Sequence, residues 1–164
     1  GIVEHLAVSK PEIAFKLIKE GRTMFQTVGD GNLNKAIYAV YGKEFSDGLL
    51  GVMSNNYGIT ITGVISPVSI SRSNRNMQNF FINGRYIRSK LLFAAVERAY
   101  QGRLTSGRCP ICFLNIVVPH SNVDVNVHPN KLDVKFENNI FCISNPNERR
   151  STIELVKNNP TSAL

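Results

Sequence analysis

The chain has 164 residues, 43% of them hydrophobic, which suits one domain with a sizeable core, or one domain plus a piece of another. It has no long apolar run and no basic-then-apolar export signal at its N-terminus, so we expect a soluble, cytoplasmic protein without a membrane partner. Three cysteines, an odd count, argue against a disulfide framework and fit a reducing compartment.

The net charge of +7 is concentrated in one part of the sequence. The segment from Arg72 to Arg108 holds eight basic residues and one acidic residue, Glu97, and therefore accounts for the whole excess. The remaining 11 basic and 11 acidic residues cancel. This distribution is typical of a surface that binds phosphate or an anionic headgroup, with ordinary solvated charge as the alternative.

The N-terminal part predicts one helix and one strand. Ser9 and Glu12 have the spacing of a capping box, and an apolar stripe follows, so we expect a helix that ends at Gly21. Residues 22–28 predict a strand. The break at Gly29-Asp30-Gly31 is a natural boundary between modules.

The next part predicts a helix, two strands and a loop. An amphipathic helix is expected from Leu33 to Tyr41, with Gly42 past its end. Two short strands are expected between residues 49 and 66, with Asn55-Asn56 in their turn. Residues 66–77 are rich in Ser, Asn and Arg and predict an exposed, mobile loop, whose alternative role is to order on a partner.

The pattern then predicts a strand, a tight turn, a helix and a central strand. Residues 79–82 form the strand, and Asn83-Gly84 is a strong turn dipeptide. Ser89 is placed to cap a helix that Gly102 ends. Residues 111–118 are apolar on both faces and predict a central strand. The core face of the helix is Leu92, Ala95, Val96 and Ala99.

A stretch of alternating valines predicts the next strand. Residues 123–127 have the period of a half-buried strand, and Pro129 ends it because proline cannot donate to a sheet ladder. Lys131 then lies on a tight loop, from which it can reach an anion bound outside the domain. A solvated loop lysine is the alternative reading of this position.

The C-terminal part is less regular. Residues 132–137 alternate as a last strand, and a polar tail follows in which residues 148–157 have a weak helical pattern. Strands mixed with a few helices, several of the strands antiparallel, indicate an α/β (α+β) two-layer sandwich.

Cys109 and Cys112 have the spacing of a zinc half-site or a redox pair. The other potential ligands, His120, His128 and Cys142, are scattered, and Cys112 lies in a strand that is apolar on both faces. These observations favour a core thiol over a metal or redox site. For His128, a hydrogen bond to backbone is favoured over a general base, because no nucleophile has a recognisable spacing from it.

The turn at Asn83-Gly84 places two arginines immediately before a helix. Arg85 and Arg88 have the chemistry for bidentate phosphate contacts, and Tyr86 adds a face for stacking. A solvated hairpin turn is the alternative. The chain has no Walker-type phosphate loop and no paired carboxylates, so it does not look like a complete enzyme.

Taken together, four phrases of the sequence resemble the MutL family of DNA mismatch-repair proteins. They are the residues 79–85 (Asn-Phe-Phe-Ile-Asn-Gly-Arg), the helix through Ala99-Tyr100, the Cys-Pro strand, and residues 123–136 with His128-Pro129-Asn130-Lys131. Their order and separation also agree with the family. The resemblance covers residues 1–137 and is to the second domain of the family's N-terminal half.

The resemblance implies a division of the chain. Residues 1–29 look like the terminal helix and strand of a preceding ATP-binding module of the GHKL type. Residues 30–137 look like a transducer domain with the fold of domain 2 of ribosomal protein S5, a mixed sheet with helices on one face. Residues 138–164 follow the family pattern poorly. We therefore expect a fragment of a longer protein.

The resemblance also implies site residues and partners. The family's His-Pro loop lysine contacts the γ-phosphate of ATP in the neighbouring module, a role that carries over to Lys131, while Arg85 and Arg88 are candidates for DNA contact. ATP and Mg²⁺ would be bound by the full-length protein, a GHKL-type ATPase, whereas this chain alone is expected to bind no cofactor and to catalyse nothing.

The expected partners are duplex or single-stranded DNA near the nucleoid, the ATP-binding module, the mismatch-recognition protein and a second copy of the parent. The alternative function is a stand-alone nucleic-acid-binding module of the same fold without ATP coupling.

Overall fold

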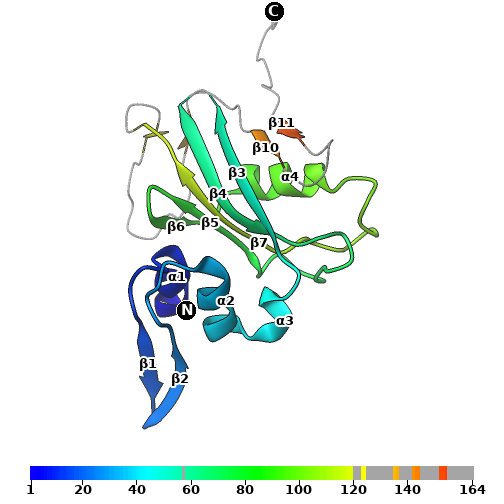
Figure 1. Cartoon of the computed structure of the whole chain (residues 1–164). Helices are drawn as coiled ribbons and strands as arrows, with labels where there is room; N and C mark the ends of the chain where they lie inside the picture. The colour runs from blue at the N-terminus through cyan, green and yellow to red at the C-terminus, as the bar shows by residue number, and fades with distance from the viewer. Residues whose placement is uncertain (57, 120–122, 125–134, 137–141, 145–151, 155–164) are drawn as a thin grey trace, which may run out of the picture.

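The structure is a computed structural model that describes residues 1–56 and 58–119, together with the short pieces 123–124, 135–136, 142–144 and 152–154. Its centre is a five-stranded sheet (Figure 1). The strands of this sheet are β3 (Leu50–Asn56), β4 (Ile59–Ile65), β5 (Gln78–Ile82), β6 (Arg85–Ile87) and β7 (Cys112–Val117). They follow the order β3-β4-β7-β5-β6, in which β5 and β7 are parallel and all other neighbours are antiparallel.

The inner strands β5 and β7 are buried on both faces. All residues of β5 are buried. In β7, all residues except Asn115 and Val117 are buried. A strand of this kind needs cover from two sides. The sheet accordingly packs against helices on both of its faces.

Four helices supply this cover: α1 (Ile2–Ser9), α2 (Leu33–Tyr41), α3 (Lys43–Ser46) and α4 (Lys90–Ala99). On one face, Leu92 of α4 belongs to a buried apolar cluster with Phe80. On the other face, Val8 of α1 and Ile37 of α2 belong to a second cluster, with Phe81. Figure 1 shows α4 on the opposite side of the sheet from α1, α2 and α3.

The predicted fold class, an α/β fold with a mixed sheet like domain 2 of ribosomal protein S5, is confirmed. The placement of the helices differs in one respect. Helices were expected on one face, whereas α1 and α2 also cover the second face, because residues such as Phe81 and Phe113 would otherwise expose apolar surface there.

The N-terminal part differs from the prediction. After α1 the chain forms an antiparallel hairpin of β1 (Lys16–Lys19) and β2 (Arg22–Gln26), so the predicted helix between Ser9 and Gly21 is wrong. The Ser9 hydroxyl donates to a carbonyl inside α1 and caps no later helix. Glu20 and Gly21 both have positive φ, as in a two-residue hairpin turn, and a short apolar run fits a strand as well as a helix.

Two smaller predictions are also wrong. Asn55 and Asn56 belong to β3 and pair with β4, so the turn lies later in the chain. A helix was expected at residues 148–157, but Thr152–Glu154 form a strand, β11, that pairs with β10 (Cys142–Ser144). In both places the sequence is mostly polar, and a polar run carries little periodicity that distinguishes a helix from a strand.

Several of the other predicted elements agree with the structure, although both ends of the 66–77 loop, Ser66 and Met77, are buried instead of exposed. β2 lies within the predicted strand 22–28, and α2 ends at Tyr41 before Gly42. The Ser89 hydroxyl accepts a hydrogen bond from the backbone N–H of Leu92 and caps α4, as expected. Within the described part of the chain, no helix combines the length and the apolar character needed to cross a membrane.

Candidate nucleic-acid interface

The Asn83-Gly84 turn at the edge of the sheet is held in place by hydrogen bonds. Its two residues have φ values of 47° and 79°, as in the two-residue turns that suit a hairpin. The Asn83 side chain is bonded twice to the backbone of Val118: Nδ2 donates to the carbonyl at 3.1 Å, and Oδ1 accepts from the N–H at 3.0 Å. The turn between β5 and β6 is therefore fixed to the chain that follows β7.

Two arginines follow this turn, as predicted. Arg85 begins β6 and Arg88 comes after it, and both are exposed. Neither forms an ion pair with an acidic residue in the described part of the chain. The Arg88 guanidinium lies 5.9 Å from the centroid of the Phe93 ring. Lys10 brings a third positive charge to the turn. Its Nζ lies 3.4 Å from the position that a Cβ at Gly84 would take. Cations around one turn suit contact with phosphates.

Tyr86 lies between these arginines, but one face of its ring is covered. The His5 ring of α1 stacks on it, with centroids 3.7 Å apart and an interplanar angle of 10°. Burial raises the pKa of Tyr86, and Arg88 opposes this shift. Burial also lowers the pKa of His5, and the positive charges of the N-terminus and Arg88 add to the effect. A base therefore has at most one free face of Tyr86 to stack on. No sequence pattern links residues 5 and 86, because the stack depends on how α1 packs against β6.

Three other arginines of the basic segment hold the 66–77 loop. Arg75 makes a two-point contact with Glu97 of α4, with N–O distances of 2.6 and 2.8 Å, and this contact lowers the pKa of Glu97. Arg72 pairs with an acidic residue of α3 at 2.8 Å, and Arg108 donates to a carbonyl of the loop at 2.6 Å. The prediction that the whole charge excess forms one binding surface is therefore too broad.

The two cysteines near β7 have no feature of a reactive pair. Cys112 is completely buried, and burial strongly raises the pKa of its thiol. The pKa of the Cys109 thiol is also raised, first by burial and then by the nearby carboxylate of Glu97. A raised pKa keeps a thiol protonated and unreactive. The prediction that Cys112 is a core thiol is confirmed, and no group of three potential metal ligands occurs in the described part of the chain.

The structure describes the valine-rich stretch only at its ends. Val123–Asp124 form a short strand, β8, that pairs antiparallel with β9, Lys135–Phe136, so strands are present on both sides of the predicted loop. His128 and Lys131 lie outside the described residues. The γ-phosphate contact of Lys131 stays a prediction.

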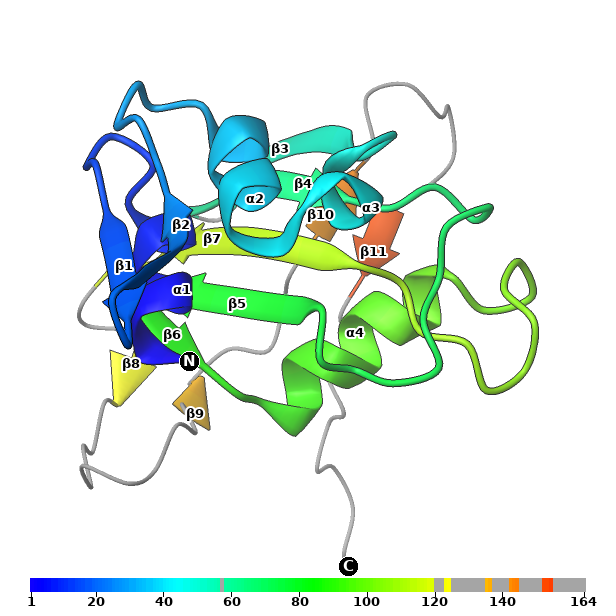
Figure 2. The same cartoon turned by 90° about the horizontal axis from the view of Figure 1, so that it is seen from below.

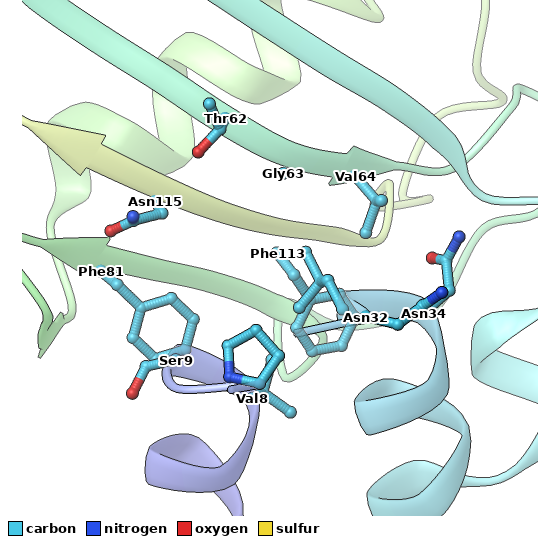
Figure 3. Close-up of a pocket in the computed structure, with 12 residues that line it drawn as sticks. Val8, Ser9, Asn32, Asn34, Thr62, Gly63, Val64, Phe81, Phe113 and Asn115 are labelled. Atoms are coloured by element: carbon cyan, nitrogen blue, oxygen red, sulfur yellow. The ribbon is translucent and has the colours of Figure 1, made fainter. Parts of the chain in front are cut away.

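A pocket of about 350 Å³ lies between α1, the start of α2 and the sheet. Figure 3 shows Phe81 and Phe113 of the sheet, and Asn34 at the start of α2, around this space. All of its lining residues are uncharged, so a phosphate or a metal ion would find no opposite charge there. The turn with Lys10, Arg85 and Arg88 is therefore a better candidate anion-binding site than this pocket.

A mixed sheet covered by helices on both faces, with a basic turn at one edge, defines an α/β domain with a candidate phosphate-contacting surface. The fold is similar to that of a crystal structure described as the N-terminal domain of a DNA repair protein, with a TM-score of 0.68 and 23% identity. That match covers 82% of this chain and 46% of the other, and it supports the fold alone.

Residues 37–145 match the family model described as "DNA mismatch repair protein, C-terminal domain". The chain is 39% identical over 142 residues to the DNA mismatch repair protein MutL of Syntrophomonas wolfei, a match that covers 85% of this chain and 24% of that protein. It is 41% identical over 138 residues to the MutL protein of Agathobacter rectalis, covering 84% and 21% of the two chains. The chain belongs to the MutL family of DNA mismatch repair proteins, as the resemblance predicted, and spans less than a quarter of the length of these two relatives.

Proposed function

We propose that residues 30–137 form the transducer domain of a MutL-like mismatch repair ATPase, and that residues 1–29 complete the ATP-binding module before it. In this role the domain couples ATP binding and hydrolysis in that module to DNA contact at the Asn83-Gly84 turn and to engagement of repair partners. Family membership supports the repair role. The surface of the N-terminal segment is the observation that carries the coupling role.

The N-terminal segment, residues 1–28, exposes much apolar surface. Its hairpin of β1 and β2 has one buried residue, Phe25. A two-stranded hairpin is marginally stable alone in water, and a cluster of exposed apolar side chains marks a contact surface. We infer that the rest of an ATP-binding module covers this segment. Of the ten large hydrophobic residues exposed in the described part of the chain, six lie here: Ile2, Leu6, Ile13, Ile18, Met24 and Val28.

The same segment is closely packed against the domain. Val8 of α1 is 2% exposed and shares an apolar cluster with Ile37 of α2. Across the boundary, the backbone N–H of Gly31 donates to the carbonyl of Pro11 at 3.0 Å. Because the connection is tight, a displacement of the ATP-binding module would reach the sheet through α1 instead of being absorbed by a loose linker.

The second part of the proposal assigns Lys131 to a composite ATP site. The described residues contain no cluster of acidic ligands for Mg²⁺, so ATP and Mg²⁺ are assigned to the adjacent module. A fixed ammonium group offsets the negative charge of the γ-phosphoryl group and responds to its presence. Loss of this contact after hydrolysis would change the preferred orientation of the two modules.

Replacing Lys131 in the full-length protein tests this assignment. Lys131→Ala should lower the ATP turnover number by about 100-fold, the size of effect seen when one charge-stabilising group is removed. Lys43→Ala is the matched control, since the Lys43 side chain is 77% exposed on α3, and it should leave turnover unchanged. Equal turnover in parent and Lys131→Ala, with both proteins folded, would remove Lys131 from the site.

Charge reversal at the turn tests the DNA contact. Arg85→Glu and Arg88→Glu should each weaken DNA binding and reduce the slope of log affinity against log salt by about one. Lys43→Glu is the control, because the Lys43 side chain is 77% exposed on α3, away from the turn. An unchanged affinity and slope in both variants would refute the turn as the DNA site.

The alternative function, nucleic-acid binding without ATP coupling, predicts a different combination of results. DNA binding would fall in Arg85→Glu, whereas DNA affinity in the full-length protein would not depend on nucleotide. Salt-dependent DNA binding alone does not separate the two functions, because both rely on the same basic turn.

A further inference from the structure

His5 links the N-terminal helix to the strand that carries the candidate DNA-contacting arginines. Its ring stacks on Tyr86, and Tyr86 stands between Arg85 and Arg88 in the chain. Figures 1 and 2 both show α1 beside β6. The stack is a direct contact between the helix assigned to the ATP-binding module and the strand that follows the basic turn.

β6 depends on this contact because it is a short edge strand. It has three residues, and within the described part of the chain it pairs with β5 and with no second strand. Inward, the Tyr86 ring approaches Phe81, with ring centroids 5.8 Å apart, so Tyr86 is held between α1 and the core. Few ladder hydrogen bonds hold an edge strand of this length, so side-chain contacts such as the His5 stack contribute strongly to its position.

Two observations favour an α1 that has more than one arrangement. The Asn79 side chain is 1% exposed, yet neither its Nδ2 nor its Oδ1 has a hydrogen-bond partner. It lies close enough to His5 to raise the pKa of that residue, but the pair does not have hydrogen-bond geometry. The pocket of about 350 Å³ beside Val8 and Ser9 leaves the end of α1 incompletely packed. A small shift of α1 therefore has both free space and an unused hydrogen-bonding group available.

We propose that His5 and Tyr86 are positioning residues that pass a movement of α1 to Arg85 and Arg88, so that DNA affinity follows the nucleotide state of the adjacent module. This inference rests on the proposed function. In the stacked arrangement Tyr86 is supported on its outer face, and the two arginines are held at one spacing. When α1 shifts, the His5 ring leaves Tyr86 and β6 loses that support.

The test measures the DNA affinity of the full-length protein with and without a non-hydrolysable ATP analogue. In the parent, the two dissociation constants should differ by about fivefold or more, the lower range of coupling between two sites. His5→Ala and Tyr86→Leu should bring this ratio close to one. His5→Phe is the matched control, because it keeps a ring that can stack on Tyr86, and it should preserve the ratio. Thermal unfolding of each variant checks that the fold is intact.

The outcomes distinguish this inference from the function on which it rests. If the DNA affinity of the parent is the same with and without the ATP analogue, the transducer function is contradicted. A parent with nucleotide-dependent affinity, together with an unchanged ratio in His5→Ala, overturns the positioning role and leaves the function standing. A ratio close to one in His5→Phe also overturns the positioning role, because a ring that can stack on Tyr86 would then not be sufficient for the coupling. If His5→Ala does not fold, Tyr86→Leu decides the question in the same way.

Discussion

The two faces of the central sheet are packed to different degrees. On the α4 face, fifteen buried residues form one apolar cluster, and the helix is capped by Ser89. On the α1 and α2 face, the buried cluster has seven residues and lies next to a pocket and the unpartnered amide of Asn79. The first face therefore stabilises the domain, and the second is suited to a contact that changes during function.

The largest expected effect compares neighbouring phenylalanines of β5 that point to opposite faces. Phe80→Ala, on the α4 face, should lower the free energy of unfolding by about 4 kcal/mol, because it leaves a closed cavity in a well-packed core. Phe81→Ala should cost about 1 kcal/mol less, because Phe81 borders the pocket and water can enter the space it leaves. Urea denaturation of both variants measures the difference. Equal losses would mean that the two faces are equally well packed.

A smaller effect is expected where β4 approaches β7. Gly63 has a φ of +145°, and a Cβ there would lie within 2.0 Å of the Phe113 carbonyl oxygen, so Gly63→Ala should destabilise the sheet by about 2 kcal/mol. Gly51 on β3 is the matched control, because a Cβ there has open space. Gly51→Ala should leave the stability unchanged or raise it slightly. A similar thermal midpoint for the two variants would show that the β4–β7 approach is not close.

The smallest effect concerns the ion pair that ties the 66–77 loop to α4. Glu97→Gln should cost less than about 1 kcal/mol, because the Arg75 side chain is 53% exposed and solvent screens the pair. The pKa of Glu97 is lowered in the folded protein, so its contribution is present above the unfolded pKa and is lost as the pH falls through the folded pKa. The stabilities of parent and variant should therefore converge in acid. A difference that is constant with pH would argue against the pairing.

Much of the α4 face could be predicted from the sequence because its signals are local. Ser89 followed by an apolar stripe defines α4, and the Asn83-Gly84 dipeptide defines the turn before Arg85. Each of these signals spans only a few neighbouring residues, so it can be recognised in the sequence without knowledge of the tertiary contacts. The same local pattern placed the two candidate arginines correctly beside the turn, but it did not predict β6, the edge strand that Arg85 begins.

On the other face α2 was predicted correctly, but α1 and the β1–β2 hairpin were not, because their organisation depends on long-range contacts. The run that includes Leu17 and Ile18 fits either a helix or a strand, and pairing with β2 decides for the strand. The two-face cover of the sheet follows from where α1 and α2 dock, which no local pattern records. The partners of Arg75 and Arg72 likewise lie far away in the chain, so charge counting overestimated the basic surface.

Family membership, the fold class and the basic turn follow from the order of residues alone, because short motifs and side-chain periodicity encode them. The His5–Tyr86 stack, the buried and unpartnered Asn79 and the pocket beside α1 exist only in the folded chain. Each of these features joins residues that are distant in sequence, and their contact is set by the packing of α1 on the sheet. Packing of this kind depends on the shape and burial of the whole core, which local propensities do not contain.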